Sequence, residues 1–239
     1  LRLQIIEDAS HAIGGKYQGE YVGDCRYSDI TVFSFHPVKI ITTAEGGMAL
    51  TNNDRLAEKM NLHRSHGVTR DQNLMTHESD GPWYYQQVEL GYNYRMTELQ
   101  AVLGISQMER LDGFVARRHE LAKRYDIFLQ QLPVTTPWQH PESYTGFHLY
   151  VIRLQLEHID ATHRQVFESL RGQGIGVNLH YIPVHTQPYY QNMGFKRGDY
   201  PQAERYYGEA ISLPIYQGLT DYQQDQVIEV LGTVLEEKV

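Results

Sequence analysis

The sequence of 239 residues is poor in cysteine and in long apolar runs. Cys25 is its only cysteine, so no disulfide can form within the chain. That fits a reducing compartment, and we expect the cytoplasm. No apolar run approaches the ~20 residues that a membrane-spanning helix needs. The sequence therefore predicts no membrane segment.

Positive charge is also scarce, because 21 Lys and Arg stand against 29 Asp and Glu. The formal net charge is −8 and the isoelectric point is about 5.8. An acidic chain has no general attraction for nucleic acid or for an anionic membrane, so we expect neither as a partner. We expect the local basic cluster of Arg117, Arg118 and Lys123 to lie on the wet face of a helix.

The sequence begins without a methionine and without the apolar core of a signal peptide. Its first six residues have the composition of the interior of a strand. We therefore expect it to be the C-terminal part of a longer protein.

Strand and helix patterns alternate along the chain, which predicts an α/β or α+β class. A long helical pattern over residues 97–132, with Gly113 as a kink or break, predicts a boundary between domains 1–110 and 111–239. The polar stretch 68–87 predicts a long functional loop. The expected strands are residues 3–6, 30–34, 46–51, 147–154 and 175–179. The other expected helices begin at Asp54, Thr162, Pro201 and Thr220.

Lys39 stands shortly after the expected strand 30–34. Ligands of open α/β sheets bind beyond the carboxyl ends of strands, and a lysine there can form a Schiff base with an aldehyde. Ser34, at the end of the same strand, can donate a hydrogen bond to a phosphate oxygen. Taken alone, Lys39 could equally be a surface lysine on a loop.

Asp8 ends the first expected strand, and His11 follows it by about one turn. A carboxylate beside a pyridine nitrogen keeps that nitrogen protonated, which suits pyridoxal 5'-phosphate (PLP) chemistry. Glu7 should point to the opposite face of the strand. A turn-forming Asp8 and a structural His11 are the alternatives that spacing leaves open.

Together these segments resemble the DegT/DnrJ/StrS family of PLP-dependent sugar aminotransferases. The family pattern is an Asp-centred strand end, a glycine-rich loop, a Ser-Phe-x-x-x-Lys segment and a Gly-Gly turn. The resemblance covers nearly the whole chain, through residues 7–12, 14–15, 22–23, 34–39, 42–47, 64–67, 91–96, 98–101, 180–185 and 211–214.

The resemblance implies the aspartate-aminotransferase type of fold: residues 1–110 would be the C-terminal half of the PLP-binding domain and 111–239 a small α+β domain. It implies that Lys39 is the Schiff-base lysine, that Asp8 pairs with the pyridine nitrogen, and that His11 lies near the phenolic oxygen. Ser34 would bind the phosphate, and Asn93 would reach the phosphate of the partner's cofactor in a homodimer. His180 and His185 would line the sugar-nucleotide entrance, and His66 could equally be structural.

The residues at 34–39 and 42–47 look most like the pseudaminic-acid branch of the family. That branch transfers an amino group from glutamate to C4 of a nucleotide-linked 4-keto-6-deoxy sugar. Family members that remove the sugar 3-hydroxyl have His where Lys39 stands, so the resemblance implies transamination over dehydration. We expect no metal site. Family members also have a long N-terminal half with a phosphate cradle that is not visible here. A non-catalytic folding or interaction module is therefore the alternative function.

Overall fold

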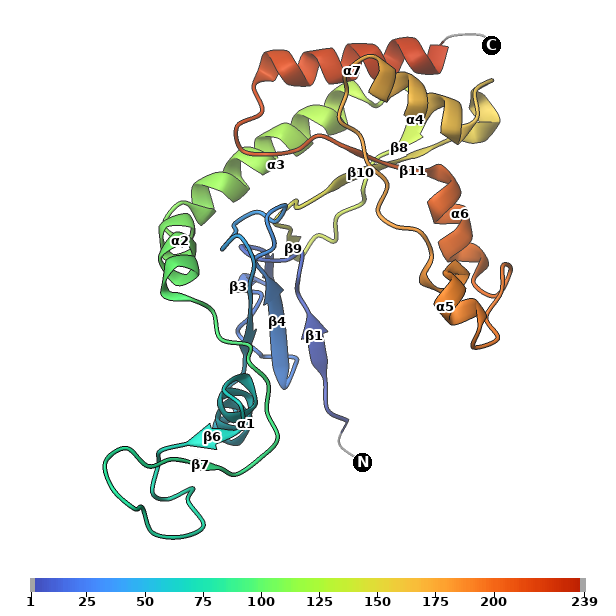
Figure 1. Ribbon diagram of the computed structural model, residues 1–239. Coiled ribbons are helices and arrows are strands. Elements are labelled where there is room, and N and C mark those ends of the chain that lie inside the picture. Colours follow the sequence, from blue (N-terminus) through green and yellow to red (C-terminus); the bar gives the residue numbers. More distant parts are fainter. Residues whose placement is uncertain (1–2, 237–239) are drawn as a thin grey trace. The chain divides into compact units, whose positions relative to one another are not determined.

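The computed structural model describes residues 3–236 of a mixed α/β chain that divides into two compact units (Figure 1). Unit 1 is formed by Leu1–Leu111 together with Glu142–Thr145. Unit 2 is formed by Asp112–Pro141 together with Gly146–Val239. The chain thus passes from unit 1 to unit 2 beside residue 110, but Glu142–Thr145, which the sequence placed in the second domain, belongs to unit 1.

The central sheet of unit 1 has the strand order β1-β4-β5. Its strands are β1 (Ile6–Asp8), β4 (Ile30–Ser34) and β5 (Gly47–Leu50). β4 forms because its residues are β-branched or aromatic and alternate between buried and half-buried. β1 begins later than expected and runs parallel to β4, with Asp8 opposite Val32. The carboxyl ends of β1 and β4 therefore lie at the same edge of the sheet.

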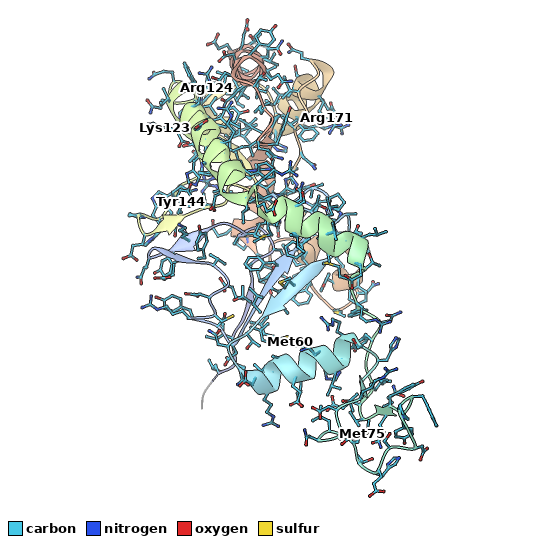
Figure 2. The ribbon with its side chains drawn as sticks, turned by 90° about the vertical axis from the view of Figure 1, so that its left-hand side faces the viewer. Met60, Met75, Lys123, Arg124, Tyr144 and Arg171 are labelled. Atoms are coloured by element: carbon cyan, nitrogen blue, oxygen red, sulfur yellow. The ribbon has the colours of Figure 1, made fainter. Side chains whose placement is uncertain are left out.

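A second sheet of unit 1 brings together segments that are far apart in the sequence. It has the order β3-β2-β9 and contains β2 (Lys16–Tyr17), β3 (Glu20–Tyr21) and β9 (Ser143–Tyr144; Figure 2). Lys16 lies opposite Tyr144, and Gln18 N donates to Glu142 O at 2.8 Å. This pairing is what places Glu142–Thr145 in unit 1.

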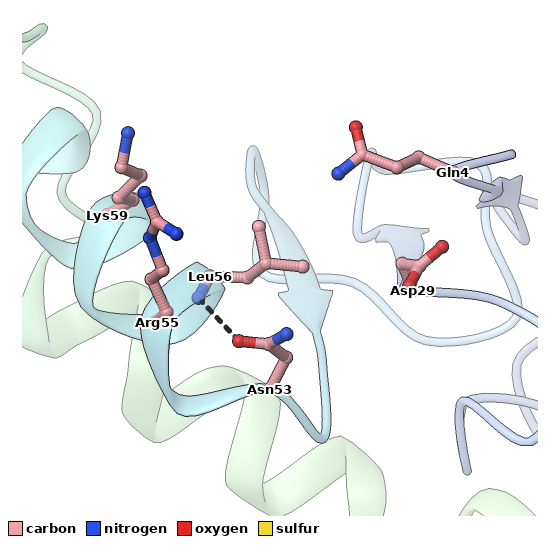
Figure 3. A pocket seen from close by; sticks show the side chains of 6 residues that line it. All are labelled: Gln4, Asp29, Asn53, Arg55, Leu56 and Lys59. Carbon is pink, nitrogen blue, oxygen red and sulfur yellow. Dashed lines mark hydrogen bonds between the residues drawn. The ribbon is translucent and has the colours of Figure 1, made fainter. Parts of the chain in front are cut away.

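The helices of unit 1 are α1 (Asp54–Arg64) and α2 (Glu98–Met108), neither of which contains a buried residue. Asn53, rather than the expected Asp54, caps α1: its Oδ1 accepts from Leu56 N at 3.2 Å (Figure 3). α2 begins with a capping box in which Thr97 and Gln100 bind each other's backbone. Between them, the polar loop expected at 68–87 is closed by β6 (Val68–Thr69) and β7 (Gln86–Gln87).

Unit 2 is built on a sheet of order β11-β10-β8. Its strands are β8 (Val134–Thr135), β10 (Tyr150–Leu154) and β11 (Ala210–Leu213), and every residue of β11 is buried. Its longer helices are α3 (Leu111–Phe128), α4 (His163–Gly172), α6 (Pro201–Glu209) and α7 (Asp221–Glu236). The shorter turns are η1 (Leu156–His158), η2 (Val184–Thr186) and α5 (Pro188–Gln191). Side chains from α3, α4, α7 and the sheet form one hydrophobic core.

Three sequence expectations are wrong: the break of the long helix at Gly113, the strand over residues 175–179, and the exposed position of Arg118. The helical pattern over 97–132 forms two helices that are separated at Glu109 and Arg110, and Gly113 lies inside α3. Residues 175–179 form no strand. Instead Asn178 makes an isolated bridge with Ser212, and Arg171 Nη1 donates to Val177 O at 3.1 Å.

Arg118 is not on a wet helix face, because only 4 % of it is exposed. Its Nη1 donates to Phe147 O and to Ile215 O, both at 2.9 Å. These backbone carbonyls partly offset the cost of burying the guanidinium, because they accept hydrogen bonds from its Nη1. Arg118 thus ties α3 to two loops of unit 2.

Within residues 3–236, none of the helices has both the length and the apolar composition needed to cross a membrane.

Candidate active site

Asp8 is the last residue of β1 and projects from the carboxyl edge of the central sheet. Its Oδ1 accepts a hydrogen bond from Ser10 N at 3.0 Å and another from Ser10 Oγ. The Ser10 hydroxyl, the Ser10 N–H and the charges of His11 and Lys39 all lower the pKa of Asp8. The carboxylate is therefore ionised at neutral pH and suited to a cationic N–H donor.

Lys39 lies in the turn that follows β4, where its N–H donates to His36 O at 2.9 Å. The next residues, Ile40 and Ile41, are 2 % and 1 % exposed and fix the turn in the interior of unit 1. Burial lowers the pKa of the Lys39 amine, while the charge of Asp8 opposes that shift. Lys39 and Asp8 are therefore within electrostatic reach of each other, as two parallel strand ends predict. A lowered amine pKa makes the nucleophilic, uncharged form more abundant.

Ser34 ends β4 beside Gly47 of β5. Its Oγ accepts from His36 N at 3.4 Å, and within residues 3–236 its hydroxyl proton has no acceptor. That proton can be donated to an anionic oxygen. Gly47 is needed at this place, because a Cβ there would stand 2.8 Å from Phe33 O. The Gly-Gly turn thus allows β5 to approach β4 closely behind Ser34.

The two histidines of the first unit that the sequence singled out are both exposed. His11 follows Asp8 within the same turn, and its charge contributes to lowering the pKa of Asp8. His66 has a φ of 62°, and its N–H donates to Tyr92 O at 2.8 Å. His11 therefore lies near Asp8 at the carboxyl edge of the central sheet. His66 joins the chain after α1 to the segment at Tyr92 through its backbone N–H.

Asn93 lies in an extended segment beside the C-terminal end of α1. It forms an isolated bridge with Ser65, and the neighbouring Tyr94 N donates to Arg64 O at 2.9 Å. The Asn93 side chain is exposed and makes no hydrogen bond to any of the residues that the structure describes. Its amide is thus presented to the outside of unit 1, and its role at a partner's cofactor stays a prediction.

His180 and His185 both belong to unit 2 and both have polar partners there. His180 Nδ1 is 2.7 Å from Ser212 Oγ, and His185 Nε2 donates to Glu204 Oε1 at 2.8 Å. His185 is only 7 % exposed, and its hydrogen bond is the largest cause that lowers the pKa of Glu204. These contacts give His185 a structural role in unit 2, and the expected contact of both histidines with a sugar nucleotide stays a prediction.

A separate surface hollow lies beside the start of α1 and contains none of the site residues expected from the sequence (Figure 3). Two basic side chains, Arg55 and Lys59, project from α1 at its rim. Within residues 3–236 there is no cluster of three or more His, Cys, Asp or Glu that could hold a metal ion.

The edge formed by Asp8, Ser34 and Lys39 fits PLP by the chemistry of its groups. An ionised carboxylate suits a protonated pyridine nitrogen, a free hydroxyl proton suits a phosphate, and a desolvated lysine suits an aldehyde. Ser10 is the residue that sequence reasoning missed. Its position two residues after Asp8 was the available signal, because Ser at this spacing can close a turn onto the aspartate.

Comparisons with known proteins agree with this chemistry. The model of the DegT/DnrJ/EryC1/StrS aminotransferase family matches residues 1–232. The chain is 37 % identical over 236 residues to the spore coat polysaccharide biosynthesis protein SpsC of Bacillus subtilis, covering 98 % of this chain and 60 % of SpsC. It is 34 % identical over 235 residues to UDP-4-amino-4,6-dideoxy-N-acetyl-beta-L-altrosamine transaminase of Campylobacter jejuni, covering 98 % and 59 %.

Among solved structures, the sugar aminotransferase Spr1654 of Streptococcus pneumoniae in its PMP form superposes with a TM-score of 0.89 at 30 % identity. That match covers 98 % of this chain and 59 % of Spr1654, whose structure is also known in a PLP form. The chain spans 59–60 % of the length of the curated relatives it matches. The fold is therefore that of the PLP-dependent sugar aminotransferases, and the chain belongs to the DegT/DnrJ/EryC1/StrS aminotransferase family.

Proposed function

We propose that this chain uses PLP to transfer an amino group, with glutamate as donor and a nucleotide-linked 4-keto-6-deoxy sugar as acceptor. The observation that carries the proposal is the pairing of Asp8 and Lys39 at one sheet edge, each with a lowered pKa. PLP is the cofactor of the family, and when bound it supplies a ring that accepts the electron pair left by a broken C–H bond.

Each residue at this sheet edge would have a different role in such a reaction. Asp8 keeps a proton on the ring nitrogen, because its carboxylate stays ionised and acts only as an acceptor. Lys39 can take a proton from carbon at its neutral Nζ and return it later, which is the work of a general base and acid. Ser34 would donate a hydrogen bond from its hydroxyl to a phosphate oxygen. His11, on the same turn as Asp8, would lie near the phenolic oxygen.

The sugar is inferred from relatives, and glutamate as the donor is what the resemblance to the family implies. The transaminase of Campylobacter jejuni acts on a UDP-linked amino sugar by its name, and residues 34–47 look most like that branch. SpsC, the relative with the higher identity of the two, is named for spore coat polysaccharide. The first name favours a nucleotide-linked sugar with a ketone at C4 as the substrate, and the second favours a role in polysaccharide biosynthesis.

The site would be shared between two copies of the chain. The Asn93 amide is exposed and has no side-chain partner among residues 3–236, so it is free to reach a phosphate held by another copy. We propose a homodimer in which each site takes Lys39 from one copy and Asn93 from the other.

A non-catalytic module is the second candidate, and the surface of α2 favours it. Leu99, Val102 and Ile105 are 85 %, 63 % and 63 % exposed, so α2 presents an apolar face that could bind another polypeptide. In this case the chain would fold or associate without turning over any substrate.

The test is transfer of labelled nitrogen from glutamate to a UDP-linked 4-keto sugar, followed by mass spectrometry. The unsubstituted chain and Lys59→Ala, which changes an exposed lysine of α1, should form labelled amino sugar, and Lys39→Ala should form none. Equal labelling by Lys39→Ala would contradict the assigned site. No labelling by the unsubstituted chain, with any nucleotide-linked 4-keto sugar supplied, would favour the non-catalytic module.

A further inference from the structure

One oxygen of Asp8 is held by a single neighbouring residue, Ser10. The Ser10 N–H donates to Oδ1 at 3.0 Å, and the Ser10 hydroxyl donates to the same oxygen. No other described residue, from 3 to 236, donates a hydrogen bond to this carboxylate, and Oδ2 has no donor. The two oxygens of Asp8 are therefore not equivalent.

The backbone of the turn is held by contacts that do not involve the Ser10 side chain. Ala9 is 3 % exposed, its N–H donates to Val32 O at 2.9 Å, and its carbonyl accepts from Ala12 N at 2.9 Å. Ser10 therefore extends from a segment that is registered to β4. Its hydroxyl and N–H meet Oδ1 from a defined direction, which restricts rotation of the carboxylate about χ2.

Ser10 acts on the carboxylate differently from the other neighbours. His11 and Lys39 affect Asp8 only through their charge, and both effects on its pKa are smaller than that of the Ser10 hydroxyl. A charge acts on both oxygens, whereas a hydrogen bond selects one. Ser10 is therefore the group that can decide which oxygen is left for a ligand.

We propose that Ser10 is a positioning residue for the cofactor: by occupying Oδ1 of Asp8 with two hydrogen bonds, it leaves Oδ2 as the oxygen that pairs with a protonated pyridine nitrogen. This inference rests on the proposed function. Ser10 itself touches neither the cofactor nor the substrate in this account. The positioning effect depends on the Ser10 hydroxyl, because its hydrogen bond lowers the pKa of Asp8 more than the bond from the Ser10 N–H does.

The first arm of the test needs no cofactor. The carboxyl carbon of Asp8 is followed by nuclear magnetic resonance during an acid titration, with the signal identified by its loss in Asp8→Asn. Ser10→Ala should raise the pKa of Asp8, because the largest cause of its lowering is removed. Ser10→Thr keeps the hydroxyl and should titrate as the unsubstituted chain does. An unchanged Asp8 titration in Ser10→Ala would overturn the proposal.

The second arm measures PLP binding by fluorescence and by the visible spectrum as a function of pH. Ser10→Ala should bind PLP roughly threefold to tenfold more weakly, as expected for the net contribution of one ordinary hydrogen bond, with an altered pH dependence of the spectrum. Ser10→Thr should restore both. Ser79→Ala, which removes an exposed loop hydroxyl, is the matched control and should change neither.

The two arms separate the inference from the proposed function. If the unsubstituted chain shows no PLP binding, the proposed function fails for this chain, and the titration of Asp8 alone decides the role of Ser10. If PLP binds and Ser10→Ala matches Ser10→Thr in affinity and spectrum, the proposed function stands and the positioning role of Ser10 is wrong.

Discussion

Unit 1 and unit 2 bury their side chains to different extents. In unit 2, α3, α4 and α7 contribute Leu121, Leu170 and Leu231 to the core, and each of these side chains is 0 % exposed. In unit 1, neither helix buries a residue, and Ile6 of β1 is 69 % exposed. Yet unit 1 contains the groups with cofactor chemistry.

Packing and chemistry therefore belong to different parts of this chain. A core such as that of unit 2 supplies stability through buried apolar area. The edge in unit 1 instead holds Asp8 and Lys39 together with two short strands, a turn and local hydrogen bonds. Substitutions should therefore separate into those that change reactivity and those that change the free energy of unfolding.

The largest effect is expected from Asp8→Asn. The substitution keeps the shape of the side chain and an acceptor for Ser10, but it removes the charge that protonates the ring nitrogen. The rate of amino transfer should fall by roughly two or more orders of magnitude with little change in stability. If Asp8 were only a turn former, the variant would keep both its stability and its activity, because Asn serves the turn as well as Asp does. Paired kinetic and denaturation measurements distinguish the two.

Leu231→Ala should leave the chemistry of unit 1 alone and destabilise unit 2. Leu231 is 0 % exposed in α7, so the lost contacts and the cavity should cost about 2–5 kcal/mol. The matched variant Leu99→Ala changes a side chain that is 85 % exposed in α2 and should alter stability by no more than about 0.5 kcal/mol. Denaturant midpoints measure both. An equally large loss of stability in Leu99→Ala would contradict the difference in packing between the two units, because it would mean that another polypeptide covers α2.

Mixing two inactive variants tests whether the site of unit 1 is shared between copies. Lys39→Ala and Asn93→Ala chains, each impaired alone, are combined under conditions in which subunit exchange is confirmed. If a site takes Lys39 from one copy and Asn93 from the other, each mixed dimer has one intact site. Half of the dimers are then mixed, so roughly a quarter of normal activity should return. No recovery would show that Asn93 serves its own copy or no site at all.

The smallest effect expected is a shift in the titration of Lys39. Burial lowers the pKa of its amine below the ordinary 10.5, so the fraction of neutral amine should rise at lower pH than for an ordinary lysine. Competitive acylation, with the modified peptide quantified at each pH, measures the midpoint. Asp8→Asn should lower the midpoint further, because the charge of Asp8 opposes the shift. A midpoint at or above the ordinary value would contradict the burial of this amine.

The sequence predicted those elements whose signals are local. Residues 30–34 form the expected strand because their β-branched and aromatic side chains alternate in burial. The capping box at Thr220 was expected from residue types three apart, and its Oγ1 accepts from Gln223 N at 3.2 Å. The chemistry of Lys39 and Asp8 was weak evidence in each residue alone. It became specific only because several motifs follow one another in the order of the family.

Features that depend on distant partners could not be predicted in this way. Nothing in the sequence of residues 143–144 predicts their pairing with β2, because two residues are too few to show the alternation of polar and apolar side chains that marks a strand. Arg118 resembles its charged neighbours in the sequence, and only the carbonyls of Phe147 and Ile215 explain its burial. Residues 175–179 have strand-like composition but find only a single bridging partner, Ser212.

The visible spectrum of the chain mixed with PLP tests the central claim most directly, namely that the edge of unit 1 formed by Asp8 and Lys39 is the cofactor site. We predict a visible band that borohydride removes, that Lys59→Ala retains and that Lys39→Ala lacks. A featureless spectrum for the unsubstituted chain, or a band of equal strength in Lys39→Ala, would contradict it.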